Sequence, residues 1–221
     1  MCEIAGVPAR INFFTNGTSD GEYMIDTGLK NSENFGKVYM WNGRNTTPEG
    51  WWYSPEAREI NGTDGELYPP GLWNHQRLNL FNGMLGRSVY IQFETESVFE
   101  NIPVYQYNFP IELYNWSLPE NKGFCDPKTP QYFNESIQPV GCLPSGILDL
   151  SSTQPAHARI YLSGSHFYRC SNALYENFIG FRSPDSNVDR TFFEMEPMTG
   201  TVINVKQTSQ VNLGILSGDL G

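Results

Sequence analysis

Few side chains of this sequence combine the type and the spacing that enzyme catalysis needs. Gly164-Ser165-His166 sets a hydroxyl beside an imidazole, but it lacks the Gly-x-Ser-x-Gly pattern of a nucleophile elbow. Neighbours in sequence also need not face one another in space. The three histidines, His75, His157 and His166, are too far apart for a zinc motif, and no Cys-x-x-Cys occurs. We therefore predict structural roles for these residues and no metal or cofactor.

Two glutamates and a group of tryptophans come closest to an enzyme site. Glu194 and Glu196 are two residues apart, so on a strand they would share one face, near the sugar platforms that Trp51 and Trp52 would offer. Glycoside hydrolases, however, place their carboxylates across the substrate, normally from separate elements. We therefore predict that the protein is not an enzyme. An alternative prediction is a secreted or lumenal carbohydrate-binding β-sandwich that uses Trp41, Trp51 and Trp52.

Two acidic turns carry most of the short motifs in the first third of the chain. Residues 59–66 contain Asn61-Gly62 and Asp64-Gly65, and a related segment occupies residues 16–22. Asn, Asp and above all Gly tolerate positive φ, so both segments predict exposed turns. Their carboxylates lack EF-hand spacing, so we do not predict a calcium site.

N-glycosylation sequons are more frequent than chance predicts. Chance alone would give roughly two or three in so Asn-rich a chain, and acceptors function only in a lumenal or extracellular compartment. The sequence has five, at Asn16, Asn45, Asn61, Asn115 and Asn134. We predict glycosylation at these positions.

The overall composition indicates an acidic, loop-rich β domain. The 221 residues carry a net charge of −10, which disfavours nucleic acid as a partner. Aromatic residues make up 14% and charged residues only 17%, and Gly and Pro are plentiful. No apolar run of 18 residues and no signal peptide is present, which by itself predicts a cytosolic chain. The sequons predict the opposite.

Period-two alternation locates the expected strands. Residues 87–94 place Val89, Ile91 and Phe93 on one face, and residues 104–109 repeat the pattern. One helix is expected over 166–178, where apolar residues recur at three- and four-residue spacing, and long loops are expected over 44–71 and 114–145. Further strands are expected at 7–14, 22–27, 36–41, 77–81, 147–150 and 159–162, and a hairpin at 191–196 and 201–206.

An ordered series of short motifs resembles the class B scavenger receptor family, which includes a fatty acid translocase and the lysosomal integral membrane protein type II. The series runs through nearly the whole chain: NGTSDGEY (16–23), WNG (41–43), WW (51–52), INGTDGE (60–66), RSVYIQFE (87–94), IPVYQY (102–107), FC (124–125), SGILDLS (145–151) and TFFEMEPMTG (191–200). Each motif is weak alone, and the order of all of them is the signal.

The resemblance implies a fold, a domain and a function. The fold is mainly β, an irregular antiparallel barrel-like or sandwich ectodomain with long loops, a few short helices and an internal lipid cavity. Residues 1–221 would form one domain, the central to C-terminal-leaning part of that ectodomain, without its transmembrane segments and apical helices. The implied function is that of a non-enzymatic membrane glycoprotein receptor that binds and transfers fatty acid, sterol or lipoprotein lipid, facing the outside of the cell or the lysosomal lumen. The resemblance also implies an alternative function, that of a lysosomal receptor that binds an acid hydrolase as its lumenal protein partner.

The implied cavity lining cannot be separated from ordinary core in the sequence, because both need only apolar side chains. The candidates are Val89, Ile91, Phe93, Val104, Tyr107 and Phe109.

The resemblance also implies a disulfide between Cys125 and Cys142, which would close a loop and stabilise the fold by about 3 kcal/mol. Ala57, Gly86 and Thr153 stand where family members carry cysteine, and the latter two match the partners of one family bridge. The pairing of Cys2 and Cys170 is left open, with a buried free thiol favoured for Cys170.

Overall fold

The computed structural model describes residues 17, 19–176, 178–216 and 218. The strand expected over residues 7–14 lies outside these residues. The described chain is mainly β, with antiparallel sheets, one of them curled as a half-barrel, and a few short helices, which confirms the predicted fold class.

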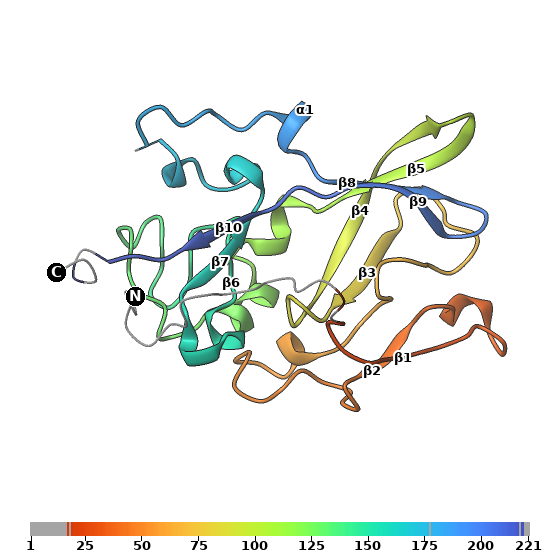
Figure 1. Cartoon of the computed structure of the whole chain (residues 1–221), viewed down its shortest axis with the longest axis horizontal. Helices are drawn as coiled ribbons and strands as arrows, with labels where there is room; N and C mark the ends of the chain where they lie inside the picture. The colour runs from red at the N-terminus through yellow and green to blue at the C-terminus, as the bar shows by residue number, and fades with distance from the viewer. Residues whose placement is uncertain (1–16, 18, 177, 217, 219–221) are drawn as a thin grey trace.

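The largest sheet has five antiparallel strands in the order β3-β4-β5-β8-β9. It occupies the right of Figure 1. Its strands are β3 (Arg77–Asn82), β4 (Arg87–Phe99), β5 (Ile102–Asn108), β8 (Phe192–Glu196) and β9 (Thr201–Lys206). The far end of the β4–β5 hairpin extends beyond β8, which pairs with β5 only at Tyr105, Gln106 and Tyr107.

Two smaller sheets complete the described fold. β6 (Leu148–Asp149), β7 (Ile160–Ser163) and β10 (Gln210–Leu213) form a three-stranded sheet in the order β10-β7-β6, on the left in Figure 1. β1 (Tyr23–Ile25) and β2 (Val38–Trp41) form a hairpin below the large sheet in the same view.

The acidic turn at residues 59–66 joins that hairpin to the large sheet. Val38 N–H donates to the Gly62 carbonyl, and Phe81 N–H donates to the Thr63 carbonyl. Gly62 has φ +96, and a Cβ there would lie 2.1 Å from the Asn79 carbonyl oxygen. Only glycine fits between the two strands at this point.

The helical segments are all short, and none in the described residues could cross a bilayer as an apolar helix. They comprise α1 (Ser186–Asp189) and short 3-10 segments at Ser32–Asn34, Glu56–Arg58, Ile111–Tyr114, Pro119–Phe124, Ser151–Thr153, Pro155–His157, Ser165–Phe167 and Asn172–Leu174. The helix expected over residues 166–178 is wrong. His166, Phe167 and Arg169 have φ of 48, 56 and 61, and left-handed residues break the helical path.

The hydrophobic core forms two clusters that meet between the sheets. The first, on the large sheet, includes Val89, Ile91 and Tyr107. The second joins Trp52 and Ala57 to the three-stranded sheet, together with Leu148 and Leu150. Leu85 and Tyr114 pack against both clusters, so the two sheets share one apolar junction.

Candidate functional site

A cavity of ≈160 Å³ lies at the junction of the two larger sheets. Its apolar walls come from the β3–β4 turn, the segment after β5 and the three-stranded sheet, and they include Leu85, Phe109, Ile111, Tyr114, Leu162 and Val211. A volume of about 150 Å³ is large enough for a benzene-sized guest. The space therefore suits a short stretch of hydrocarbon.

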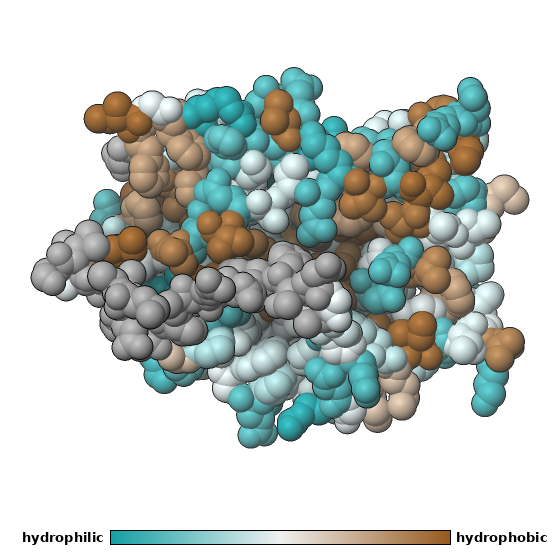
Figure 2. Space-filling model, viewed as in Figure 1, coloured by the Kyte–Doolittle hydropathy of each residue, from teal (hydrophilic) through white to brown (hydrophobic). Residues whose placement is uncertain are grey.

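The cavity opens to the surface beside apolar side chains. Ile111 and Val211 line it and are 57% and 48% exposed. Phe109 is a half-buried part of the wall and packs edge-on against Phe193 at a centroid distance of 5.4 Å. Figure 2 shows hydrophobic residues over the part of the molecule where the large sheet lies. The exposed hydrophobic residues of that sheet include Val98, Ile102 and Val205.

Polar side chains form the other side of the cavity, and Arg169 is the cation among them. Its Nη1 donates to Asn108 Oδ1 at 2.7 Å and to the Phe109 carbonyl at 2.6 Å. Its Nη2 lies 4.0 Å from Glu94 Oε1. The guanidinium is thus fixed at the end of β5, where the apolar wall begins.

Asp189, a second charged residue on the cavity wall, is fully engaged by neighbours. Arg182 Nη1 lies 2.8 Å from its Oδ2, Ser165 Oγ donates to its Oδ1 at 3.0 Å, and Asp185 N–H donates to its Oδ2 at 2.8 Å. The hydrogen bond from Arg182 is the main cause that holds the pKa of this carboxyl well below its usual range.

Ser165 and His166 join this cluster without forming a catalytic relay. Ser165 Oγ lies 3.3 Å from His166 Nδ1, and Asp189 Oδ1 lies 3.2 Å from the same nitrogen. A serine–histidine–aspartate relay needs the hydroxyl and the carboxylate on opposite ring nitrogens. The arrangement orients side chains and does not activate the serine.

The predicted lining residues separate into core and cavity. Phe109 lines the cavity. The other five are in the sheet: Val89, Ile91 and Tyr107 lie in the first core cluster, Phe93 packs against it, and Val104 is 1% exposed. Arg169, Asp189 and Val211 were not predicted from the sequence, because they follow irregular segments or belong to the four-residue β10, which carries little periodic signal.

The two glutamates of the hydrolase-like pattern have separate structural roles. Glu194 is buried and accepts hydrogen bonds from Gln106 Nε2 at 3.1 Å and Asn204 Nδ2 at 2.7 Å. Glu196 accepts from the N–H groups of Met198 and Thr199, each at 2.8 Å, and so caps the β8–β9 turn.

The prediction that the tryptophans bind sugar is wrong for Trp41 and Trp52. Trp41 and Trp52 are buried, and their indole N–H groups donate to the carbonyls of Asp20 and Gly86. Trp51 is half-buried, with its ring centroid 5.9 Å from that of Trp41. A sugar ring needs an exposed aromatic face, which Trp41 and Trp52 do not offer.

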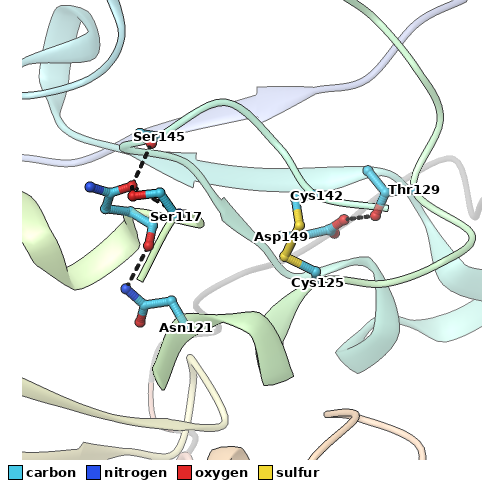
Figure 3. Close-up of a disulfide and its surroundings, with 8 residues drawn as sticks. Ser117, Asn121, Cys125, Thr129, Cys142, Ser145 and Asp149 are labelled. Atoms are coloured by element: carbon cyan, nitrogen blue, oxygen red, sulfur yellow. Dashed lines mark hydrogen bonds between the residues drawn. A yellow bond between two sulfur atoms is a disulfide. The ribbon is translucent and has the colours of Figure 1, made fainter. Parts of the chain in front are cut away.

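The cysteine pattern agrees with the resemblance. Cys125 and Cys142 are bonded across a separation of 17 residues, and nearby Thr129 Oγ1 donates to Asp149 Oδ2 (Figure 3). Cys170 is a half-buried free thiol whose pKa burial raises to about 12. Cys2 lies outside the described residues.

The two positions matched to a lost family bridge are close in space. A Cβ built on Gly86 would lie 3.6 Å from Thr153 Cγ2, and it would also lie 2.6 Å from the ring of Trp51. The Trp51 ring occupies the space that a side chain at Gly86 would need.

The described sequons differ in exposure. Asn45, Asn61 and Asn134 are exposed, whereas Asn115 is half-buried. Its Oδ1 accepts hydrogen bonds from Ser117 N–H, Ser117 Oγ and Ser145 Oγ, in the region beside the disulfide that Figure 3 shows. Asn16 lies outside the described residues. The described part of the chain also contains no cluster of three or more His, Cys, Asp or Glu able to hold a metal.

Comparison with known proteins gives one consistent result. The CD36 family profile matches residues 7–218. Lysosome membrane protein 2 of Mus musculus is 33% identical over 197 residues, covering 89% of this chain and 38% of the relative. Scavenger receptor class B member 1 of Cricetulus griseus is 30% identical over 202 residues, covering 90% and 36%. Sensory neuron membrane protein 2 of Aedes aegypti is 31% identical over 214 residues, covering 92% and 38%. The chain therefore spans less than two fifths of the length of these relatives.

Proposed function

The chain belongs to the CD36 family, and from that membership we propose that the protein is a non-enzymatic membrane receptor of the scavenger receptor type that binds and transfers lipid. The ligand classes are fatty acid, sterol or lipoprotein lipid. Transfer makes and breaks no covalent bond, and the lipid moves because an apolar path lowers the cost of leaving water.

The observation that carries this proposal is the cavity between the two sheets. Its walls are mainly apolar, it opens beside Ile111 and Val211, and a few polar groups converge at one side. This combination is typical of sites for small amphiphilic ligands. At ≈160 Å³ it would hold part of a lipid tail, as one segment of a longer path.

The cellular setting in the proposal is a membrane, with this part of the chain on the lumenal or extracellular side. The names of two relatives describe membrane proteins, one of them lysosomal. The Cys125–Cys142 bond is stable in an oxidising compartment, and exposed Asn45, Asn61 and Asn134 are suited to carry glycans. Residues 1–221 would form part of one ectodomain.

A matched pair of tryptophan variants tests the cavity. Val211→Trp places a large ring in the cavity, whereas Val205→Trp makes the same change at a 45% exposed position on β9 that does not line it. We expect Val211→Trp to weaken binding of a fluorescent fatty acid and a fluorescent sterol at least tenfold, roughly the loss of 1.4 kcal/mol, while Val205→Trp leaves both unchanged. Equal binding by both variants, or no lipid bound by the unaltered protein, would contradict the proposal.

A further inference from the structure

We propose that the polar side of the cavity is a headgroup site for an anionic amphiphile, and that Arg169 distinguishes anionic from neutral lipids. This inference rests on the lipid-binding function proposed above. The ligand chemistry is an apolar tail with a carboxylate or phosphate head, since both fit the donor geometry of a guanidinium.

Arg169 is held as a fixed donor at the end of the apolar wall. Its Nη1 is bound to Asn108 Oδ1 and the Phe109 carbonyl, and the Asn108 side chain is itself buried. Its backbone has φ +61, a left-handed conformation that is uncommon for a residue with a side chain. A donor anchored through one nitrogen can present the other to a ligand with little loss of side-chain entropy.

The second nitrogen of Arg169 has no carboxylate at hydrogen-bond distance among the described residues. Glu94 Oε1 lies 4.0 Å away, and the other oxygen of Glu94 is bound by Arg190. Arg190 also donates to Gln106 Oε1, and its buried Nε has no hydrogen-bond partner within the part of the chain that the structure describes. The guanidinium groups of Arg169 and Arg190 therefore share the carboxylate of Glu94, and the nearby buried carboxylate of Glu194 is bound by Gln106 and Asn204. Arg169 Nη2 is left able to bind an incoming anion.

The nearby carboxylate of Asp189 does not cancel this charge. It is bound by the guanidinium of Arg182, at 2.8 Å from each of its oxygens, and its side chain is only 1% exposed. Paired in this way, Asp189 and Arg182 contribute little net field at the cavity, whereas the shared Glu94 leaves Arg169 attractive to anions.

The lipid tail would lie against the apolar wall of the cavity, which adjoins Arg169. The Phe109 carbonyl binds the guanidinium while the Phe109 ring forms the cavity wall, so head and tail sites adjoin within one residue. The volume of ≈160 Å³ accepts the first part of a chain, and the mouth at Ile111 and Val211 lets the rest leave toward solvent or a lipid surface.

Three ten-carbon probes and two variants test the inference by calorimetry on the full chain. The probes are decanoate, decyl phosphate and 1-decanol, which share a tail and differ in the head. Arg169→Gln removes the charge, and we expect a loss of roughly tenfold for the two anions with no change for decanol. Glu94→Gln keeps the shape and removes the competing carboxylate, so we expect both anions to bind about threefold more tightly.

The outcomes separate the headgroup site from lipid binding as such. Equal weakening of all three probes by Arg169→Gln, or no gain with Glu94→Gln, would overturn the assignment of Arg169. Decanol binding as tightly as decanoate would overturn headgroup selection and leave lipid binding intact. If no probe binds the unaltered protein, the proposed function fails and the headgroup site fails with it. If Arg169→Gln does not fold, the Glu94→Gln result decides whether Arg169 binds the headgroup. The ratio of the decanoate affinity to the decyl phosphate affinity shows whether the site prefers a carboxylate or a phosphate.

Discussion

At the residue scale, Gly86 connects the tryptophan pair to the sheet junction. Its carbonyl accepts the Trp52 indole N–H at 2.6 Å, and its φ of +59 lies in the left-handed region. A Cβ there would lie 2.6 Å from the Trp51 ring, which packs against the second core cluster. The residue is constrained by its conformation and by the space around it.

Gly86→Ala should therefore destabilise the fold more than conformational strain alone would. Gly43→Ala is the matched control, because Gly43 has φ +72 and no described atom lies within 4 Å of the position that its added methyl group would take. We expect about 1 kcal/mol of lost unfolding free energy for Gly43→Ala and a further 1–3 kcal/mol, roughly, for Gly86→Ala. Urea denaturation followed by tryptophan fluorescence measures both. Equal losses would show that the Trp51 ring moves aside at no cost.

The sequence predicted single residues well where a local rule applies. Gly62 in an Asn-Gly turn was expected at positive φ, and its φ is +96. The roles of Glu194 and Glu196 depended instead on partners from β5, β9 and the following turn, with Gln106 lying 88 residues away from Glu194. Such partners are set by the assembled sheet and leave no short-range signal.

At the element scale, alternation was a reliable guide to strands and apolar spacing was a poor guide to the helix. The pattern Val89, Ile91 and Phe93 predicted β4, which continues past a bulge after Phe93 to Phe99. Over residues 166–178 the apolar spacing does not belong to a helix, because left-handed residues at 166, 167 and 169 interrupt the backbone. Phe167 and Phe178 both pack against Phe181, although no continuous helix joins them.

The disulfide closes a segment that has little regular structure of its own. Between Cys125 and Cys142 the described chain contains no strand or helix, and buried Gln138 holds it by bonds to Pro130, Tyr132 and Phe133. We expect Cys125→Ser with Cys142→Ser to lower the unfolding free energy by about 3 kcal/mol, mostly through the unfolded chain. Thermal unfolding of the double variant beside the reduced unaltered protein checks this, and matching midpoints for the two are expected. If both the double variant and the reduced protein unfolded at the same midpoint as the oxidised unaltered protein, the prediction would be contradicted.

At the scale of the whole molecule, the cavity is the feature that the sequence could not locate. Its walls combine the β3–β4 turn, the end of β5, β7, the segment around Asp189 and β10, and the first and last of these are separated by more than half the chain. Each piece alone resembles ordinary core or loop. The family resemblance supplied the expectation of a cavity, and the packing of two sheets against each other gives it its walls and its polar side.

Glycosylation of the native protein is the whole-molecule consequence of the proposed lumenal setting. Asn45, Asn61 and Asn134 are exposed and should carry glycans, whereas the half-buried Asn115, with its Oδ1 bound by Ser117 and Ser145, should have the lowest occupancy of the four described sequons. Enzymatic removal of N-glycans converts each occupied Asn to Asp, so peptide mass spectrometry reads the four sites separately. High occupancy at Asn115 would mean that its side chain turns outward in the native protein, and that the hydrogen bonds beside the disulfide are dispensable. An absence of glycans at all four sites would contradict the lumenal or extracellular setting, and with it the receptor function proposed for this chain.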